Sequence, residues 1–319
     1  MRIAILDAFT ADQGDATVWK GLEALGSVTR FERSTPAEVI ARGEGCEVLL
    51  TNKALVQAEQ VAALPDLRYV GVMATGTNVV DLKACAARGI AVTNVPGYST
   101  ESVAQLVFAL ILHLCQDVAG HHARSVGDGW ASSPDFCFFT RPLRELAGKH
   151  LVIVGAGSIG RAVARIAEAF AMRVTYARVP GSSSPDRVDL ADCLPQADVI
   201  SLHCPLTEAT RHLVNADFLS RCRRGALLVN TGRGPLIDEA ALGAALASGQ
   251  LGGAGLDVLA QEPPPRGHAL LKADAPWASR LVVTPHIAWG TVEARTRLIA
   301  EVVANLAAFQ RGEVRNRVG

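Results

Sequence analysis

The sequence carries no excess of charge of either sign, because its 31 lysine and arginine residues are matched by 31 aspartate and glutamate residues. A protein that binds nucleic acid or an anionic membrane surface usually needs a basic excess. Long hydrophobic runs are also missing. The longest, Leu106 to Leu114, is interrupted by His113 and falls well short of the roughly 20 residues that a membrane-spanning helix needs. We therefore expect the partner to be a small molecule, rather than nucleic acid or a membrane.

Cysteine motifs are absent as well. The seven cysteines are scattered, odd in number and without a C-x-x-C pair. This pattern is typical of reduced thiols, and it argues against a disulfide framework and against a zinc site. The opening residues, Met1 to Asp7, are too short and too quickly polar for a secretory signal. We therefore expect a cytoplasmic protein that binds no metal.

The chain is long enough for two domains, since it has 319 residues of which 49% are hydrophobic and 19% charged. In the first hundred residues, short apolar strands alternate with stretches of helical spacing. The expected strands are Ile3–Asp7, Val48–Thr51, Arg68–Val72 and Ile90–Asn94, and the expected helices are Ala16–Leu25, Pro36–Arg42, Ala58–Leu64 and Val80–Arg88. Such alternation predicts a parallel sheet that is covered on both faces.

A second α/β alternation runs from about Leu146 to Pro285. Its expected strands are Leu151–Val154, Arg173–Tyr176, Val199–Leu202, Ala226–Asn230, Gly253–Leu256 and Leu281–Thr284. One amphipathic helix, Val292–Gln310, follows the last strand and can cross back to the first unit. We therefore expect a discontinuous first domain of residues 1–100 and 287–319, a second domain of residues 101–286, and an active-site cleft between them.

A long helix and an irregular segment join the two units. Thr100 can cap a helix over Glu101–Val118, with an acidic residue favourably placed in its first turn. The following segment, Gly127 to Arg144, has little periodicity but many Trp, Phe, Pro and Ser residues. Its apolar side chains need cover, either from a second subunit or from their own domain.

A glycine-rich loop, Gly-Ala-Gly-Ser-Ile-Gly from 155 to 160, connects the strand Leu151–Val154 to a helix over Arg161–Phe170. In this context Gly155 permits a tight turn, Gly157 lets the backbone approach a pyrophosphate, and Gly160 lets the helix pack close to the strand. The start of the helix offers amide donors to phosphate groups. The loop therefore predicts a dinucleotide cofactor.

The end of the next strand bears on the choice of cofactor. An NAD site usually has an acidic residue about 20 residues beyond the first glycine, where it binds the ribose hydroxyls. Here Ala177 occupies that place and Arg178 follows, with serines at 182 to 184 close behind. An arginine and hydroxyls without a repelling acid favour the 2′-phosphate of NADP(H). The alternative is an NAD site that tolerates the lost acid beside an exposed Arg178.

Three polar residues follow apolar strands late in the chain: Arg233, Glu262 and His286. Ligands of open parallel sheets bind outside the carboxyl ends of the strands. A guanidinium group fits a carboxylate bidentately, and histidine, with an unperturbed pKa of about 6.5, can give and take a proton. A carboxylate beside it favours the imidazolium form and fixes the ring. The set predicts binding of a 2-oxo acid and protonation of its carbonyl, although Arg233 alone would more often be a surface residue.

At these residues the chain resembles the D-isomer-specific 2-hydroxyacid dehydrogenase family. The resemblance extends from the loop at 73–76 through the glycine loop to the segment 284–286. It implies two doubly wound parallel-sheet domains, a Rossmann nucleotide domain and a flavodoxin-like substrate domain. It also implies that Arg233 binds the substrate carboxylate and carbonyl, that Glu262 partners the histidine, and that His286 is the acid/base.

The segments 95–100, 130–139 and 286–289 look most like the glycerate dehydrogenase/hydroxypyruvate reductase branch. This likeness implies reduction of hydroxypyruvate or glyoxylate to D-glycerate or glycolate, by a homodimer built around the helix at 101–118 and the segment after it. Asp257 is placed to contact the nicotinamide, and we expect substrate contacts from Thr75 and Gly76. Further cofactor contacts are expected from Ser158, Ile159, Cys204, Pro205, Thr231 and Gly232.

The chain departs from the family pattern at Ala177, where the usual acid is missing, and at Ala288, where many members have glycine. Formate-using relatives pair the histidine with glutamine, so Glu262 indicates a carbonyl/alcohol interconversion instead. Two alternatives stay open at this level. One is a D-lactate-type dehydrogenase of another small 2-oxo acid. The other is a nucleotide-sensing binding protein similar to the corepressors that share this fold.

Overall fold

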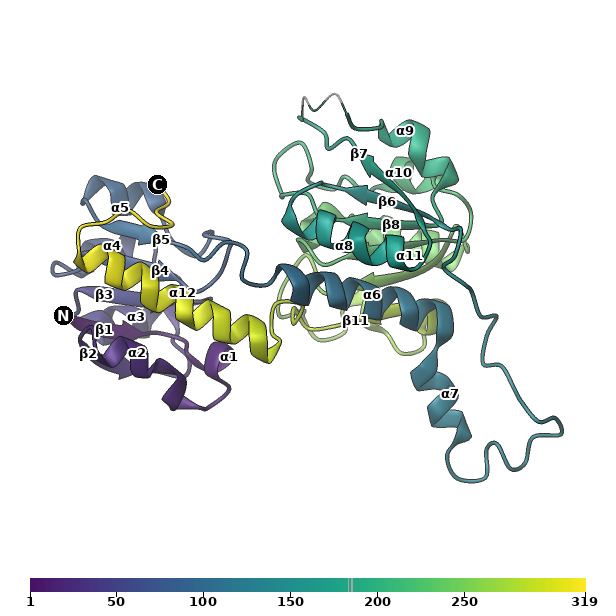
Figure 1. The fold of residues 1–319 in the computed structure, drawn as a ribbon, viewed down its shortest axis with the longest axis horizontal. Helices are drawn as coiled ribbons and strands as arrows, with labels where there is room; N and C mark the ends of the chain where they lie inside the picture. Colours follow the sequence, from purple (N-terminus) through teal and green to yellow (C-terminus); the bar gives the residue numbers. More distant parts are fainter. Residues whose placement is uncertain (183, 185) are drawn as a thin grey trace. The chain divides into compact units, whose positions relative to one another are not determined.

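The computed structural model describes residues 1–182, 184 and 186–319 and divides the chain into two compact units. The first unit consists of Met1–Ser99 with Trp289–Gly319, and the second of Thr100–Ala288 (Figure 1). Each unit has a parallel sheet of its own and hydrophobic clusters of its own. The predicted α/β fold class, with two doubly wound units, is confirmed.

The sheet of the first unit has five strands in the order β2-β1-β3-β4-β5. These strands are β1 (Arg2–Ile5), β2 (Ser27–Arg30), β3 (Val48–Thr51), β4 (Tyr69–Val72) and β5 (Ala91–Thr93). All neighbouring pairs are parallel, and the strand order is that of flavodoxin-like sheets. The sequence did not predict β2, because its residues Ser-Val-Thr-Arg form a partly exposed edge strand without a buried apolar run.

Helices cover both faces of this sheet. Successive residues of a strand point to opposite faces, so Ile3 and Ile5 lie in one hydrophobic cluster and Ala4 and Leu6 in the other. The first cluster is closed by η1 (Ala16–Trp19), α2 (Lys20–Glu23) and α12 (Val292–Gln310), and the second by α3 (Pro36–Gly43), α4 (Ala58–Ala63) and α5 (Leu82–Ala87). The helix expected over residues 16–25 is therefore divided into η1 and α2. A short helix, α1 (Phe9–Asp12), precedes them.

The sheet of the second unit has six parallel strands in the order β11-β10-β9-β8-β6-β7. They are β6 (His150–Val154), β7 (Arg173–Ala177), β8 (Val199–Leu202), β9 (Ala226–Asn230), β10 (Leu251–Leu256) and β11 (Leu281–Val283). The chain runs outward from β6 to β7, then returns to β8 on the other side of β6 and continues to β11. Between β6 and β8 lies the topological switch point, where open α/β sheets bind their ligands.

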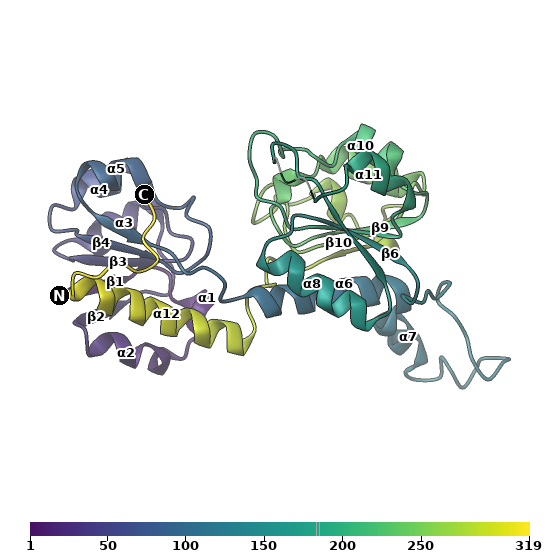
Figure 2. The same ribbon diagram turned by 45° about the horizontal axis from the view of Figure 1, so that its top comes forward.

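Two layers of helices enclose this second sheet. Helices α6 (Thr100–Gln116) and α8 (Ser158–Ala169) pack on one face, and α9 (Leu190–Cys193), α10 (Ala216–Arg221) and α11 (Glu239–Ala247) on the other. Figure 2 shows α6 and α8 on one side of the sheet and α10 and α11 on the opposite side. Residues 151 and 153 of β6 face the α6 side, while 152 and 154 face the α10 side.

The long helix expected over Glu101–Val118 is broken in the structure. Helix α6 ends at Gln116, Asp117 takes a left-handed φ of 47°, and α7 (Val118–Ser125) continues at an angle of 53°. In the part of the chain that the structure describes, no single helix has the length and apolarity to cross a bilayer. Only this bent pair passes such a test, and α6 is largely buried in its own unit.

The segment after α7 leaves the body of the second unit as an extended arm, residues 126–145 (Figure 1). It contains neither helix nor strand among its described residues. Three of its large aromatic side chains are solvent-exposed: Trp130 by 55%, Phe136 by 90% and Phe139 by 63%. Their own unit therefore does not cover these side chains.

Candidate active site

The glycine-rich loop joins β6 to α8 at the switch point. Gly155 has a φ of +108°, and a Cβ added there would lie 2.6 Å from the backbone of His203 and Cys204, which follow β8. At Gly160 a Cβ would collide with the Gly155 carbonyl oxygen. Both positions are thus restricted to glycine by close backbone packing.

Gly157 is different, because a Cβ added there would meet nothing within 4 Å. It is the N-cap residue of α8, and no side chain caps the first amides of that helix. Ser158 and Ile159 are the first two helical residues, so their amides lie at the open end. Uncapped amide donors beside open space fit a pyrophosphate group.

The end of β8 contains a polar pair that the sequence did not single out. Ser201 Oγ lies 2.8 Å from His203 Nε2, and burial lowers the pKa of His203 to about 4. Cys204 is only 4% exposed, and burial raises the pKa of its thiol to about 11. A cofactor could therefore meet Cys204 only through its backbone, while Pro205 is exposed and held through its carbonyl by Thr210 Oγ1 at 2.7 Å.

At the end of β7, Ala177 is almost completely buried and offers no carboxylate. The guanidinium of Arg178 lies 3.2 Å from a carboxylate oxygen of Asp189 and also donates to the Arg187 carbonyl. The guanidinium of Arg187 lies over the ring of Tyr176, 4.9 Å from its centroid. Neither Asp189 nor Arg187 was predicted from the sequence. Of the expected serines, Ser182 and Ser184 have hydroxyls 3.2 Å apart, and Ser183 is outside the described residues.

Asn230, at the end of β9, organises the turn that carries Arg233. Its side-chain oxygen accepts from the Gly232 amide at 3.0 Å, and its side-chain nitrogen donates to the Arg233 carbonyl at 2.9 Å. The Arg233 side chain is exposed and donates to the Gly232 carbonyl at 2.8 Å. It forms no ion pair with any residue that the structure describes. Thr231 Oγ1 is buried without a hydrogen-bond partner among these residues, which fits an incoming ligand group.

Gly234 brings the loop after β10 against the Arg233 turn. A Cβ at Gly234 would collide with the carbonyl group of Leu259. The Leu259 amide in turn donates to Glu262 Oε1 at 3.0 Å. The loop that carries Glu262 therefore packs directly on the turn that carries Arg233.

Glu262 and His286 are in direct contact. His286 Nδ1 lies 2.7 Å from Glu262 Oε2, with side-chain exposures of 26% and 34%. A nitrogen so close to a carboxylate oxygen carries the proton between them. The other ring nitrogen, Nε2, forms no hydrogen bond with the residues that the structure describes and is available to a ligand.

Asp257 fixes the backbone around His286. Its carboxylate, in a residue only 1% exposed, accepts from Thr284 Oγ1 at 2.6 Å and from the amides of Ile287 and Ala288 at 2.9 Å each. The Asp257 carbonyl also accepts from the His286 amide at 2.8 Å. Burial raises the pKa of Asp257, and the three hydrogen bonds oppose that change. His286 has a φ of 54°, which is uncommon for a residue other than glycine, so this network holds a backbone conformation that local preference disfavours. Contact of Asp257 with a nicotinamide stays a prediction.

In the first unit, Thr75 and Gly76 follow β4. Thr75 Oγ1 donates to the Val95 carbonyl at 3.0 Å, and the Thr75 carbonyl accepts from Asn94 Nδ2 at 2.7 Å. A neighbouring turn is held by Asp7, whose buried carboxylate accepts from the backbone amides of residues 52, 53 and 54. This role of Asp7 could not be predicted, because a lone aspartate after a strand carries no sequence signal for it.

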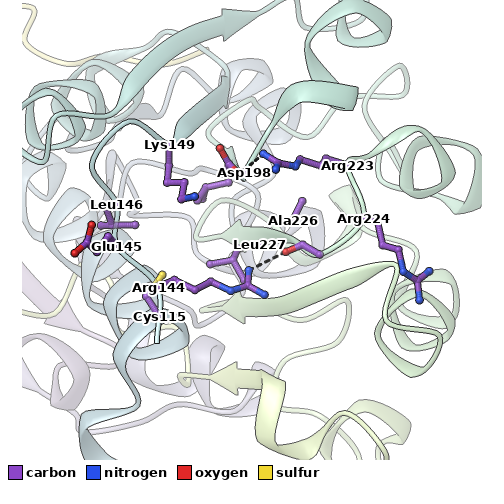
Figure 3. Close-up of a pocket in the computed structure, with 12 residues that line it drawn as sticks. Cys115, Arg144, Glu145, Leu146, Lys149, Asp198, Arg223, Arg224, Ala226 and Leu227 are labelled. Atoms are coloured by element: carbon purple, nitrogen blue, oxygen red, sulfur yellow. Dashed lines mark hydrogen bonds and ion pairs between the residues drawn. The ribbon is translucent and has the colours of Figure 1, made fainter. Parts of the chain in front are cut away.

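One pocket of about 290 Å³ lies away from these residues, at the amino edge of the second sheet. Figure 3 shows Lys149 and Arg223 directed toward Asp198, with Arg144 beside Leu227. Arg223 pairs with Asp198 at 2.5 Å, and Arg144 donates to the Gly225 carbonyl at 2.9 Å. These arginines are already engaged by the protein itself, and the pocket contains none of the predicted site residues.

Comparison with known proteins decides the family. Residues 108–288 match the domain described as "D-isomer specific 2-hydroxyacid dehydrogenase, NAD binding domain". The chain belongs to the D-isomer specific 2-hydroxyacid dehydrogenase family. Its resemblance to that family, read from the sequence motifs, is thereby confirmed, and the protein is an oxidoreductase that acts on CH–OH groups.

Several relatives match over most of their length. The chain is 41% identical to a hydroxypyruvate reductase from Blautia hydrogenotrophica, covering 100% of this chain and 99% of the relative. It is 42% identical to a glycerate dehydrogenase from Methylorubrum extorquens, covering 89% of each. Among solved structures, the TT0316 protein from Thermus thermophilus superposes with a TM-score of 0.83 at 35% identity, over 100% of both chains.

Proposed function

We propose that this dehydrogenase reduces a small 2-oxo acid, hydroxypyruvate or glyoxylate, to the D-2-hydroxy acid. The observation that carries the proposal is the 2.7 Å contact between Glu262 and His286, on a loop that packs against the Arg233 turn. The names of the two relatives, a hydroxypyruvate reductase and a glycerate dehydrogenase, support the same substrate class. Reduction of a 2-oxo acid needs a hydride donor, a proton donor and an anchor for the substrate carboxylate. His286 can supply the proton and Arg233 the anchor, while the hydride would come from the cofactor.

The bound nicotinamide would supply the hydride. The Arg233 guanidinium, free of any carboxylate partner among the described residues, binds the substrate carboxylate as a planar fork. His286 Nε2 donates a proton to the carbonyl oxygen, while Glu262 stabilises the imidazolium through Nδ1. Thr75 and Gly76 are proposed as further substrate contacts. Hydride and proton together convert the 2-oxo acid to the 2-hydroxy acid.

The cofactor pyrophosphate is proposed to bind at Gly157, Ser158 and Ile159. Two observations support this assignment: the open space over Gly157 and the uncapped amides of α8. The unpartnered buried hydroxyl of Thr231, after β9, is proposed as a separate cofactor contact. Oxidation of the reduced cofactor, followed by absorbance with hydroxypyruvate, glyoxylate and pyruvate, tests the function. Turnover of hydroxypyruvate or glyoxylate is expected to exceed that of pyruvate. Preference for pyruvate would favour a D-lactate-type dehydrogenase, and no turnover of any of them would favour a nucleotide-binding protein without catalysis.

Replacing Glu262 by glutamine is expected to move the upper pH limit of oxo-acid reduction to lower pH. Without the carboxylate charge, the imidazolium of His286 loses the stabilisation that it gains at 2.7 Å, so the acid form is depleted sooner as pH rises. Glutamine can still accept from the Leu259 amide, so the loop is retained. The pH profile of kcat measures the effect, and Glu208→Gln, an exposed residue of the same unit, is the matched control. An unchanged profile for Glu262→Gln would separate Glu262 from proton transfer.

We propose NADPH as the preferred cofactor. Ala177 provides no carboxylate to repel a 2′-phosphate, and Arg178 provides a partly exposed guanidinium. One charge-assisted hydrogen bond contributes roughly 1.5–3 kcal/mol, or about ten- to over a hundredfold in affinity. We therefore expect a higher kcat/KM with NADPH than with NADH, and the reverse order for the double variant Ala177→Asp/Arg178→Ala.

Asp189 supplies a sharper form of this cofactor test. Its carboxylate lies 3.2 Å from the Arg178 guanidinium and competes with a phosphate for the same charge. Asp189→Asn should therefore increase the preference for NADPH, whereas Asp192→Asn, an exposed carboxylate three residues later, should leave it unchanged. Preference of the wild-type protein for NADH would mean that Arg178 does not bind the cofactor.

We propose that the chain forms a homodimer through α6 and the arm of residues 126–145. The exposed Trp130, Phe136 and Phe139 support this assembly, because their own unit leaves them uncovered. Light scattering coupled to gel filtration should give twice the chain mass of 33.6 kDa. Phe136→Ser should shift the protein toward the monomer, whereas Val314→Ser, which changes another highly exposed apolar residue in the first unit, should not. A wild-type monomer would contradict the proposal.

A further inference from the structure

A second carboxylate–histidine pair lies behind the loop that carries Glu262. Glu239 is the first residue of α11, and His268 immediately precedes the short helix η4 (Ala269–Leu271). His268 Nε2 lies 3.1 Å from Glu239 Oε2, and the side chains are only 11% and 22% exposed. Burial of two ionisable side chains costs free energy unless they form hydrogen bonds with each other or with the backbone. The hydrogen-bond partners of this pair therefore indicate why it is buried.

The position of the ring proton follows from the surroundings of His268. Its Nδ1 is buried without a hydrogen-bond partner among the described residues, whereas its Nε2 faces a carboxylate oxygen. A lone pair directed at that oxygen would be repelled, so Nε2 carries the proton and donates it to Glu239. The histidine thereby fixes the orientation of the Glu239 carboxylate.

The other oxygen of Glu239 acts on the Glu262 loop. Glu239 Oε1 accepts from the Ala260 amide at 2.8 Å. The preceding amide, that of Leu259, donates to Glu262 Oε1 at 3.0 Å. Two successive amides of one turn thus donate to two different carboxylates, that of Leu259 to Glu262 and that of Ala260 to Glu239. Glu262 then presents its second oxygen to His286 Nδ1 at 2.7 Å.

The peptide unit between Leu259 and Ala260 is also packed closely against Gly234, where any side chain would collide with the Leu259 carbonyl. A turn that is both closely packed and hydrogen-bonded has little freedom to rotate the Glu262 carboxylate away from His286. A contact as short as that between Glu262 and His286 depends on such support, because a displacement of even about 1 Å weakens a charge-assisted hydrogen bond steeply.

We propose that Glu239 and His268 are positioning residues that hold the turn from Leu259 to Glu262 so that Glu262 stays aligned with His286. The inference rests on the proposed role of Glu262 in proton transfer. Neither Glu239 nor His268 touches a reacting atom in this scheme. They act on the reaction only through the alignment of Glu262.

The test compares three single variants of the full-length protein with the wild type: Glu239→Ala, Glu239→Gln and Glu262→Gln. Glu239→Ala is expected to lower kcat about tenfold, equivalent to about 1.4 kcal/mol, and to move the upper pH limit of kcat in the same direction as Glu262→Gln. Glu239→Gln should recover most of the activity, because its amide oxygen can still accept from the Ala260 amide. Cofactor affinity, measured by quenching of tryptophan fluorescence, should change by less than about twofold in each variant.

A double-variant cycle separates positioning from a general loss of stability. If Glu239 acts through Glu262, then Glu239→Ala should cause no further shift of the pH profile in the Glu262→Gln background, whereas independent effects would add. Asp217→Ala removes an exposed acidic residue from the first turn of α10 and is the control for loss of helix-terminal charge. It should leave kcat and the profile unchanged. His268→Ala, which keeps the bond to Ala260, should produce a smaller shift in the same direction, and it carries the test if Glu239→Ala does not fold.

The outcomes distinguish the positioning role of Glu239 and His268 from the catalytic role of Glu262. A normal pH profile in Glu239→Ala and His268→Ala, together with a shifted profile in Glu262→Gln, would overturn the positioning role alone. Additive effects in the double variant would overturn it as well. A normal profile in Glu262→Gln would instead remove the proposed role of Glu262, and with it the basis for this inference.

Discussion

His286→Asn is expected to lower kcat at neutral pH by at least about a hundredfold, the lower end of the usual contribution of general acid–base catalysis. Asparagine cannot donate a proton to the substrate oxygen at any pH near neutrality. It does tolerate a positive φ, so the backbone conformation of 54° at this position should survive. Cofactor affinity should be nearly unchanged, because the side chain is lost without disturbing the Asp257 network.

His212→Asn is a matched control for that variant. His212 is an exposed histidine of the same unit, and it also has a positive φ, 50°. Substitution there should leave kcat unchanged, which separates loss of the acid from any effect of asparagine in this backbone conformation. Steady-state kinetics across the pH range, together with cofactor titration, measure both variants. Turnover retained in His286→Asn would require another proton donor and would reject the assignment.

Arg233→Ala is expected to lower kcat/KM for the oxo acid by roughly ten- to over a hundredfold, the equivalent of one hydrogen bond to a charged group at about 1.5–3 kcal/mol. Arg233→Lys should recover part of this loss through its charge, but not the planar fork that binds a carboxylate bidentately. The turn itself should persist in both variants, because Asn230 holds it through backbone groups of residues 232 and 233.

The control for Arg233 is Arg211→Ala, which removes an exposed arginine elsewhere in the same unit and should leave kcat/KM unchanged. Saturation curves for the oxo acid at fixed cofactor concentration give KM and kcat separately. Most of the Arg233→Ala effect should fall on KM, with a smaller loss of kcat from poorer orientation. Unchanged kinetics in Arg233→Ala would place the carboxylate anchor elsewhere, and the backbone amides of Thr75 and Gly76 would be the next candidates.

The fold follows from the sequence where the signal is local. Buried parallel strands such as β6 and β9 are continuous apolar runs, and the glycine loop stands in the strand–loop–helix context that it requires. Edge strand β2 escaped prediction, because its partly exposed residues lack such a run. The break at Asp117 was also missed. The apolar spacing continues across it, while the left-handed φ of one residue turns the helix.

The candidate site was predictable only as a set of residue types. Arg233, Glu262 and His286 each follow an apolar strand, so their common edge of the sheet could be inferred from the parallel topology. The supporting residues could not be inferred. Asp257 contacts residues 27 to 31 positions later, and Glu239 contacts residues 21 and 29 positions later. No spacing rule connects such positions.

By itself, the sequence determined the fold class, the nucleotide loop and the chemical groups available for the reaction. Periodicity, glycine placement and residue type are local properties, because each depends on residues that are close together along the chain. Only the tertiary structure decided which of those groups meet. It placed Glu262 2.7 Å from His286 and brought Glu239 and Gly234 against the turn that precedes Glu262. It also placed the Asp189 carboxylate beside the Arg178 guanidinium, whereas the sequence alone had indicated no acidic residue near Arg178. Each of these contacts depends on how strands and loops pack against one another, and packing is a property of the whole unit rather than of any segment.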